Sequence, residues 1–176
     1  LCVARKDRFD AGYKLADDPS FRELLEIGAW LKNSDLDQLE FASQVVESFP
    51  DEKDSCFGAP WIVHAVSSGS LNSVRWMIEK GVNLRPIADD GYPPVISCIE
   101  VEGKEKYEIL RALIGAGANI NERGINGWTP LHMAAVRDDE MSMRVLLEAG
   151  ADRTITTEID DDATAEEEAR NLGHAK

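Results

Sequence analysis

The sequence predicts an all-α solenoid, built of stacked helix-turn-helix units that are joined by hairpin loops. Two series of glycines support this prediction, because each series returns at a nearly constant spacing. The glycines that precede the units, at spacings of 33 and 36 residues, are Gly58, Gly91 and Gly127. The glycines that close the units, at spacings of 36 and 33 residues, are Gly81, Gly117 and Gly150. A period of this length is typical of proteins that stack one supersecondary unit upon the next.

The unit from Gly127 to Asp152 shows how one repeat is expected to fold. Thr129 is a suitable N-cap, since its hydroxyl oxygen can accept hydrogen bonds from the unpaired N–H groups of the first turn. Pro130 then occupies the first helical position, where a missing N–H costs nothing. A second apolar segment follows and ends at Gly150, where a left-handed C-terminal cap is expected. The unit is therefore a helix, a turn, a second helix and a closing glycine.

This unit closely resembles the ankyrin repeat. The TPLHxA signature of that family is matched by Thr129, Pro130, Leu131, His132 and Ala134. The resemblance implies three recognisable repeats behind a degenerate helix pair that caps the stack. The predicted divisions are a loosely ordered N-terminal lead-in at 1–18 and an ankyrin-repeat domain at 19–176, which comprises a degenerate capping repeat at 19–50, repeats at 57–85, 91–121 and 127–153, and a C-terminal cap at 160–176.

Local signals predict where several helices begin and end. Ordered structure is expected to begin at Asp18 or Pro19, and Asp35 is a plausible N-cap for the next helix. That second helix is expected to be stopped by Pro50. The middle repeat is three residues longer than its neighbours. The extra length is expected in the charged segment 100–106, which would lengthen the turn between the two helices of that repeat.

Charge and composition indicate which kinds of partner the chain is suited to bind. Lys and Arg number 19 and Asp and Glu number 33, which gives a net charge of −14. Such a chain is poorly suited to nucleic acid, whose phosphates need clustered Lys and Arg, and no segment approaches the ~18 apolar residues of a membrane span. The scattered cysteines, Cys2, Cys56 and Cys98, form no CxxC pair, which favours reduced thiols and a cytoplasmic location. We therefore expect a protein partner with a basic surface, and neither nucleic acid nor membrane.

The histidines favour a structural over a catalytic interpretation. In the family that the chain resembles, the signature histidine, here His132, bonds across the turns of adjacent repeats. His64 is expected on an inner helix and His174 in the turn of the cap, and the three histidines have no zinc spacing. The acidic stretch 158–168 could be a calcium site, but it lacks the glycine and the alternate ligands of an EF-hand loop. No nucleophile or phosphate-loop motif is present, so we predict no enzyme activity, no catalytic residue, no cofactor and no metal.

Three aromatic residues mark the candidate binding surface. Phe57 precedes Gly58, whereas Tyr92 and Trp128 each follow the glycine that precedes their unit. By the resemblance, these positions lie on the hairpin that projects beside the inner helices, so contact with a partner is one interpretation. The other interpretation is that each ring packs on the neighbouring hairpin, and the two are about equally supported by the sequence.

Polar positions flank this aromatic column. Asp89 and Asp90 fall toward the hairpin tips, and Asp160 and Asp161 continue the series if the cap follows the same path. The slots of the inner helices that face the concave groove hold Ser67, Glu100 and Arg137. Aromatic side chains supply anchoring area and carboxylates steer a basic partner. The predicted partner-binding residues are Phe57, Asp89, Asp90, Tyr92, Asn126, Trp128 and Arg137.

The predicted function follows from the resemblance rather than from any catalytic motif. It is a non-catalytic protein–protein interaction module that binds a partner protein through its concave face and hairpin tips. The alternative is an inhibitor or immunity-type protein that neutralises a basic enzyme or toxin. Fold alone does not fix function, so the sequence leaves both interpretations open.

Overall fold

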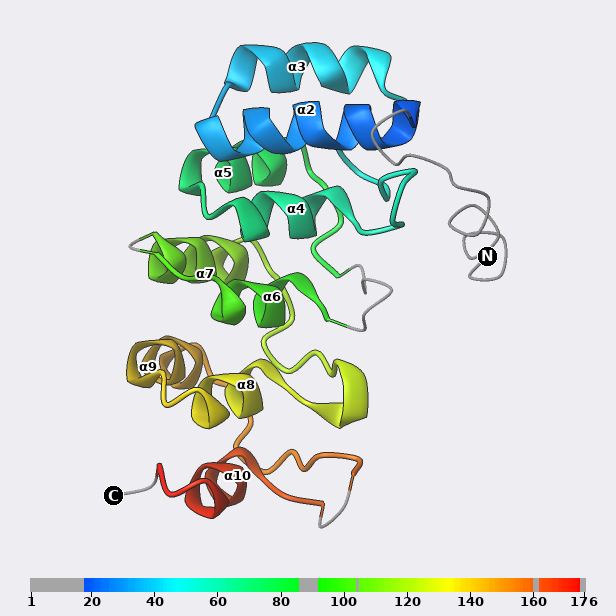
Figure 1. The fold of residues 1–176 in the computed structure, drawn as a ribbon. Coiled ribbons are helices and arrows are strands. Elements are labelled where there is room, and N and C mark those ends of the chain that lie inside the picture. The colour runs from blue at the N-terminus through cyan, green and yellow to red at the C-terminus, as the bar shows by residue number, and fades with distance from the viewer. Residues whose placement is uncertain (1–17, 86–91, 104, 160–161, 175–176) are drawn as a thin grey trace, which may run out of the picture.

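A computed structural model describes residues 18–85, 92–103, 105–159 and 162–174. Its helices stack along one axis, from the α2/α3 pair at one end to α10 at the other (Figure 1). Within the described residues, extended pairing is limited to two isolated bridges, and the predicted all-α solenoid is confirmed. The predicted lead-in lies, apart from Asp18, outside the described residues. The helices are α2 (Pro19–Asn33), α3 (Leu36–Val45), α4 (Trp61–Ser68), α5 (Leu71–Glu79), α6 (Pro94–Glu100), α7 (Lys106–Gly115), α8 (Pro130–Val136), α9 (Glu140–Glu148) and α10 (Ala165–Asn171).

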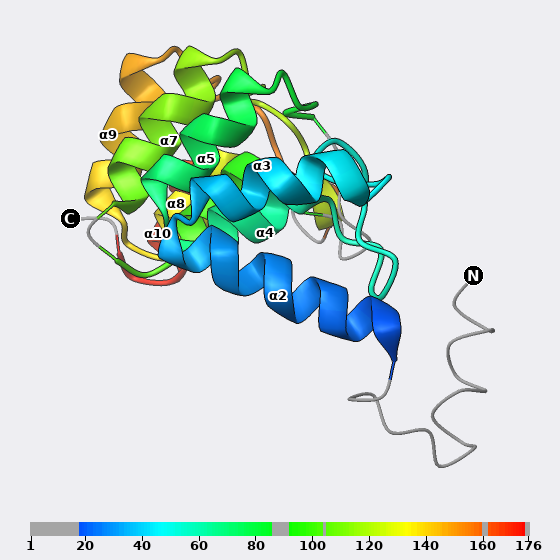
Figure 2. The same ribbon diagram turned by 90° about the horizontal axis from the view of Figure 1, so that it is seen from above.

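The helices form two layers. The first helix of each pair packs on the first helix of the next, so that α2, α4, α6, α8 and α10 make an inner layer. The second helices α5, α7 and α9 pack in succession as an outer layer, and they lie side by side when the stack is seen from above (Figure 2). α3 packs on α2. Each unit therefore contacts mainly its neighbours, as expected of a solenoid.

Side-chain caps fix where the helices begin. The Asp18 carboxylate accepts a hydrogen bond from the Ser20 N–H at 2.8 Å, and α2 begins at Pro19 as predicted. Because such an oxygen satisfies a backbone donor that the helix leaves unpaired, it stabilises the first turn. The other residues whose side chains accept such a bond at helix starts are Asp35, Ser70, Thr129, Asp139 and Thr164.

The core runs between the two layers. Small side chains on the inner helices allow close approach of neighbouring helices, and Ala65, Cys98 and Ala134 are all fully buried. Burial raises the pKa of the Cys98 thiol to about 12, so this cysteine is inert. The large side chains that fill the space between layers include Trp61, Met77, Ile96, Leu110 and Leu146.

The closing glycines and the long turn lie where the sequence predicted. The three closing glycines have left-handed φ angles of 76°, 92° and 90°, in the order Gly81, Gly117 and Gly150. α6 ends at Glu100 and α7 begins at Lys106, so the extra residues lengthen the turn between those helices.

The N-terminal pair differs from the expectation at the end of its second helix. α3 ends at Val45, ahead of Pro50, because Phe49 leaves the helix to pack against the rings of Trp61 and Trp76, with centroid distances of 5.3 and 5.7 Å. In addition, several apolar side chains of this pair are exposed. They are Leu25 at 56%, Phe41 at 56% and Val45 at 60%. This pair therefore covers α4 but leaves apolar side chains in solvent.

Candidate partner-binding surface

The loop before α4 is organised by one buried carboxylate. Asp54 is only 3% exposed and lies inside the loop that it shapes. Its oxygens accept hydrogen bonds from the backbone N–H groups of Cys56, Phe57 and Ala59 at 2.9, 2.5 and 2.7 Å. The Nε2 of His64 on α4 lies 3.0 Å from the same carboxylate. The loop is thus tied to the inner helix, and His64 has the structural role that the sequence indicated.

The ionisation of Asp54 is stabilised by these contacts. Burial by itself raises the pKa of a carboxyl group, because it disfavours the charged form. Here the hydrogen bonds from His64, from the Phe57 N–H and from the Ala59 N–H outweigh burial and hold the pKa of Asp54 at about 2. The carboxylate is therefore charged at neutral pH, and in this form it accepts the hydrogen bonds that connect the loop to α4.

Phe57 projects from this loop and meets a second aromatic ring. Its side chain is 44% exposed. The ring of Phe21, near the start of α2, lies edge-on at a centroid distance of 6.3 Å and an interplanar angle of 90°. This geometry is the favoured one for aromatic pairs. The pair forms an apolar surface on a fixed loop, beside the inner layer.

The hairpin before α8 is a short turn, η2 (Ile125–Gly127). The Gly124 N–H donates to the Trp128 carbonyl at 2.7 Å and closes the loop. Asn126 has a left-handed φ of 60°, which asparagine tolerates better than most residues. Ile125 at the tip is 46% exposed and Asn126 is exposed as well. The tip thus offers one apolar and one amide side chain to solvent.

The next hairpin packs directly on this one. The Glu158 N–H donates to the Asn126 carbonyl at 2.7 Å. Arg123 Nη1 donates to the Thr156 carbonyl at 2.9 Å and pairs with Glu158 Oε1 at 3.2 Å. A Cβ at Gly127 would lie 2.8 Å from the Glu158 nitrogen, so a glycine is required for this approach. The loops before α4, α8 and α10 project on one side of the stack (Figure 1).

His132 links the same two repeats from inside. Its side chain is buried, with Nδ1 2.8 Å from Thr129 Oγ1 and Nε2 3.1 Å from the Ala163 carbonyl. Burial lowers the pKa of His132, which favours the neutral ring. A neutral ring that donates from Nε2 to the carbonyl leaves Nδ1 to accept from the threonine hydroxyl. The bridging contact that the resemblance implied is confirmed.

The two other predicted aromatic residues are less exposed than Phe57. Tyr92 and Trp128 are half-buried and pack against the core. The Trp128 ring lies 6.5 Å from that of His132, measured between centroids. Part of each ring therefore packs against the core, and part of it remains exposed.

The predicted polar residues are placed as follows. Arg137 follows α8 on the inner layer and is exposed, with Nη2 3.4 Å from Glu102 Oε1 in the long turn after α6. Asn126 is on the hairpin tip. Asp89 and Asp90 lie outside the described residues, as do Asp160 and Asp161. On the inner helices, the two further positions assigned to the groove, Ser67 and Glu100, are exposed.

Several residues of this surface were not singled out from the sequence. Asp54 precedes Phe57 by three residues, which is a spacing typical of an aspartate that caps its own turn, so it could have been found. Phe21 and Leu25, both on α2, were not singled out either. Leu25 lies about 120° around the helix from Leu31, which is fully buried, so an angular plot would have placed it outside the core.

Two kinds of site were sought among the described residues, a metal-binding group of side chains and a membrane-spanning helix, and neither is found there. Among them, no group of three His, Cys, Asp or Glu side chains is placed to hold a metal ion. No helix in this part of the chain combines the length and hydropathy that crossing a bilayer requires. The calcium alternative involves Asp160 and Asp161, which are outside the described residues.

Three relatives show what this chain is similar to. XBAT34 of Arabidopsis thaliana, named as an E3 ubiquitin-protein ligase, is 31% identical over 113 residues, which cover 62% of this chain and 29% of the relative. A Treponema pallidum (strain Nichols) protein with the name of an ankyrin repeat-containing protein is 27% identical over 150 residues, covering 85% of this chain and 46% of the relative. The RelA-associated inhibitor of Mus musculus is 46% identical over 59 residues, covering 34% and 7%. The chain thus spans less than half the length of each relative.

A family model described as "Ankyrin repeats (3 copies)" matches residues 65–157, which is just over half of the chain. The match covers α5 to α9 completely and includes the TPLH unit. Ankyrin repeats are protein–protein interaction modules. The stacked helix pairs, the histidine bridge and this match agree, and the chain belongs to the ankyrin repeat family.

Proposed function

We propose that this chain is a non-catalytic binding module that holds a partner protein against its hairpin tips and concave face. The observation that carries the proposal is the Phe57–Phe21 pair. An aromatic side chain that is 44% exposed on a loop tied down by a buried carboxylate is suited to anchor a partner. Its conformation is fixed before binding, so little conformational entropy is lost when the partner docks.

The charge of the chain indicates the chemistry of the partner. A net charge of −14 repels acidic surfaces and attracts basic ones over a range set by the ionic strength. Asp89 and Asp90, which the sequence places near the hairpin tips, steer the approach of such a partner. The exposed edges of Tyr92 and Trp128 extend the apolar contact beyond Phe57. Replacing both aspartates by asparagine is expected to slow association and to weaken its dependence on salt.

The direct test is affinity capture with three forms of the chain as bait. A partner that uses this surface is retained by the parent and depleted at least about tenfold by Phe57→Ser, since central aromatic anchors carry much of the binding energy. Phe41→Ser is the matched control, because Phe41 is similarly exposed but lies on α3. Equal recovery by all three baits would place the binding surface elsewhere on the molecule.

A second candidate is an inhibitor or immunity-type protein that neutralises a basic enzyme or toxin. The acidity of the chain and the relative named RelA-associated inhibitor support it. The two candidates differ in what binding does to the captured partner. An inhibitor abolishes the catalytic activity of that partner at a one-to-one ratio, whereas a simple adaptor leaves the activity unchanged.

A further inference from the structure

Each of the three repeats ends in a loop that contains the same local hydrogen bond. The side chain two residues after the closing glycine accepts a bond from the backbone N–H two residues further on. The acceptor and the donor are Asn83 and Arg85 at 2.9 Å, Asn119 and Asn121 at 3.0 Å, and Asp152 and Thr154 at 2.8 Å. Such Asx turns give the loops the same local backbone course, so positions 85, 121 and 154 are equivalent.

Two of these loops are bonded to the loop before them. In each case the donor is the backbone N–H two residues after the closing glycine. The Asn83 N–H donates to Asp51 Oδ1 at 2.8 Å, and the Asp152 N–H donates to Asn121 Oδ1 at 3.0 Å. These bonds join successive units along the side of the stack where the outer helices end, which we call the loop edge.

The interface between the α4/α5 pair and the α6/α7 pair lacks this bond. The donor there is the N–H of Asn119, which bonds to no protein acceptor within the part of the chain that the structure describes. The position equivalent to Asn121 is held by Arg85, whose guanidinium has donors only. A groove of about 300 Å³ is lined by Leu84 and Arg85 of one loop and by Gly117 of the other. The two loops are therefore not joined at this point of the loop edge.

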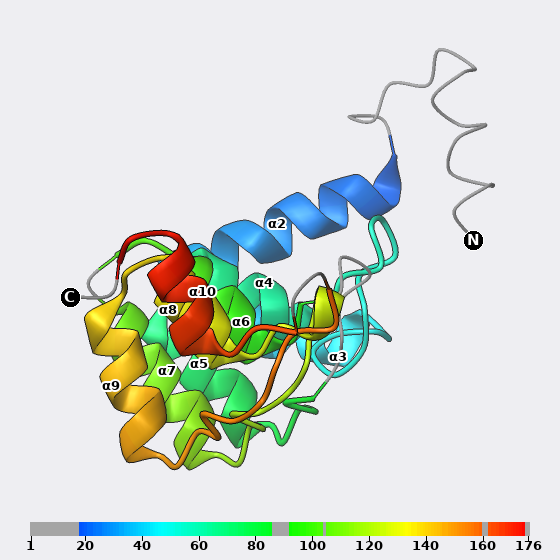
Figure 3. The ribbon, with the colours of Figure 1, turned by 90° about the horizontal axis from the view of Figure 1, so that it is seen from below.

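The opposite side of the same interface is joined. The outer helices run from the turns to the loop edge, so the turns lie on the other side of the stack, which we call the turn edge (Figure 3). There Glu105 Oε2 accepts a hydrogen bond from the Leu71 N–H across the interface at 2.7 Å. Since this N–H is one that α5 leaves unpaired at its start, the carboxylate also stabilises the first turn of α5. A Cβ at Gly69 would lie 3.7 Å from Val101 Cγ1, which is ordinary packing contact.

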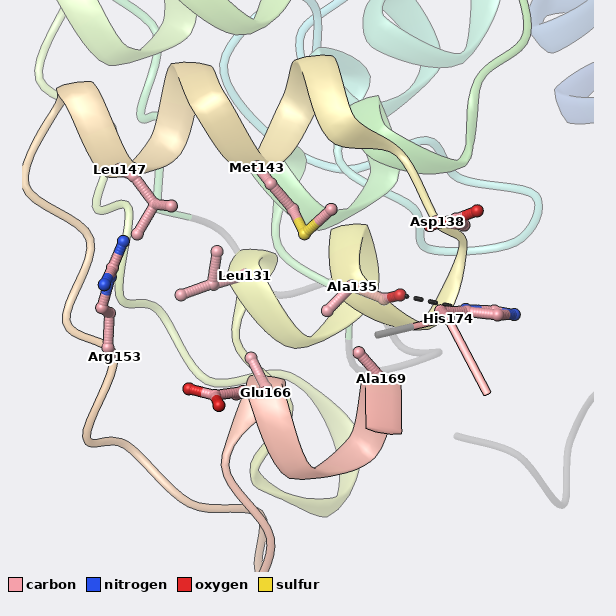
Figure 4. Close-up of a pocket in the computed structure, with 10 residues that line it drawn as sticks. Leu131, Ala135, Asp138, Met143, Leu147, Arg153, Glu166, Ala169 and His174 are labelled. Atoms are coloured by element: carbon pink, nitrogen blue, oxygen red, sulfur yellow. Dashed lines mark hydrogen bonds between the residues drawn. The ribbon is translucent and has the colours of Figure 1, made fainter. Parts of the chain in front are cut away.

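The turn edge is also joined at the other interfaces between the described helix pairs. At least one side-chain contact crosses each of them. They are Ser34 Oγ to Ser70 Oγ at 2.7 Å, the ion pair of Lys106 with Asp139, and His174 Nδ1 to the Ala135 carbonyl at 3.3 Å, which is dashed in Figure 4. The step from α5 to α7 thus combines a joined turn edge with an open loop edge.

We propose that this step is a hinge, with the turn edge as its axis, about which the two halves of the stack move relative to each other. The first half is 19–85 and the second is 92–174. Phe57 belongs to the first half and the hairpin 124–128 to the second, so opening of the loop edge changes the distance between them. The hinge adapts the binding surface to its partner; this last step rests on the proposed function, whereas the hinge itself does not. Motions of this kind are typically absorbed by a few loop residues.

The test supplies the missing acceptor. Arg85→Asn puts an amide oxygen in the position that Asn121 Oδ1 has at the next interface, and is expected to close the loop edge. The Asn119 amide is then expected to exchange with solvent at least about fivefold more slowly, as for one added hydrogen bond. Arg85→Ala is the matched control, because it removes the same charge and supplies no acceptor. Helix content and unfolding temperature are measured in parallel for each variant.

A distance measurement in the free chain reports the motion itself. Nitroxide labels are attached to cysteines that replace Glu79 on α5 and Glu148 on α9, both exposed, in a chain with serine at positions 2 and 56. Two steps of helix packing separate them, so pulsed electron paramagnetic resonance is expected to give distances centred at about 20 Å. The distribution is expected to be broad in the parent and in Arg85→Ala, narrower in Arg85→Asn, and broader still in Asn121→Ala, which removes the bond at the next interface.

Two outcomes of these measurements would overturn the hinge. One is an equal width of the distribution in the parent, Arg85→Asn and Asn121→Ala. The other is slower exchange of the Asn119 amide in Arg85→Asn without any narrowing, because the bond would then form without a motion to restrict. Neither measurement involves a partner, so failure of the hinge is distinguishable from failure of the proposed function. A captured partner that Phe57→Ser loses, but that binds Arg85→Asn and the parent equally, would overturn the adaptive role alone.

Discussion

Lys106 Nζ lies 2.7 Å from Asp139 Oδ2, and the two side chains are only 9% and 8% exposed. Lys106 begins α7 and Asp139 caps α9, so this ion pair joins two successive repeats. Lys106 also donates to the Ile99 carbonyl at 3.2 Å, and Asp139 accepts from both the N–H and the hydroxyl of Ser142. Burial alone would raise the pKa of Asp139, but the bonds from Lys106 and Ser142 outweigh it and lower the pKa.

Removing the cation of this pair is expected to destabilise the chain strongly. Lys106→Met leaves Asp139 buried with its countercharge gone, which costs roughly 3–5 kcal/mol of unfolding free energy. Asp139→Ser keeps an N-cap for α9 and removes the charge, so the double variant is expected to recover much of the loss. Urea unfolding of the parent, both single variants and the double variant measures the coupling. Additive losses would show that the two side chains act independently.

Asp54 is expected to make stability depend on pH in the acid range. Its pKa falls from 3.8, the ordinary value of an aspartate, to about 2 in the folded chain. The contribution is therefore fully present above about pH 4 and is lost as the pH falls toward 2; its size is about 2 kcal/mol. The measurement is the unfolding free energy of the parent and of Asp54→Asn between pH 2 and pH 5. The difference between them is expected to narrow as the pH falls, and a constant difference would contradict this role.

Two glycines with nearly the same backbone angle separate strain from contact. Gly81 and Gly127 have φ angles of 76° and 74°. A Cβ at Gly81 meets nothing within 4 Å, whereas at Gly127 it would lie 2.7 Å from Glu158 Cγ. Gly81→Ala is therefore expected to cost about 1–2 kcal/mol from the left-handed angle alone, and Gly127→Ala at least about twice as much. If thermal unfolding showed that the two variants lose the same stability, the hairpins that meet at Gly127 and Glu158 would be able to move apart without a cost in free energy.

The His132 bridge is expected to be visible in both stability and titration. His132→Ala removes the bond to the Ala163 carbonyl and is expected to lower the unfolding free energy by about 1–2 kcal/mol. Because burial lowers the pKa of His132 below 6.5, its nuclear magnetic resonance titration is expected to have a midpoint below that of a free histidine. A titration midpoint equal to that of a free histidine, together with unchanged stability of His132→Ala, would show that His132 does not bridge the two repeats.

The repeat period could be predicted from the sequence because the backbone conformation at the end of each unit favours one residue type. A left-handed cap after each second helix favours glycine, so the spacing of Gly81, Gly117 and Gly150 gives the length of the repeat directly. Thr129 and Pro130 likewise predicted the start of α8, because a threonine hydroxyl can cap the first turn and a proline fits its first position. Such features depend only on neighbouring residues, so they can be recognised in a single sequence.

Contacts between repeats could not be predicted from such local features. Lys106 and Asp139 are far apart in the sequence, and neither differs in type from the many charged residues on the surface. The exposed fractions of Phe21 and Leu25 depend on which face of α2 meets α4, and the spacing of apolar residues within α2 does not determine that face. Tyr92 and Trp128 are half-buried because they pack against the core, which the positions of these residues in the sequence did not indicate.

The most direct test of the central claim is a hydrogen-exchange map of the captured complex. With the partner bound, amide protection is expected to rise in the loop 54–59, in the hairpin 124–128 and at the exposed positions of the inner helices. Exchange in α5 and α7 is expected to stay as in the free chain, because these outer helices face away from the proposed surface. New protection confined to the outer helices, with the loop 54–59 unchanged, would contradict binding through the hairpin tips and the concave face.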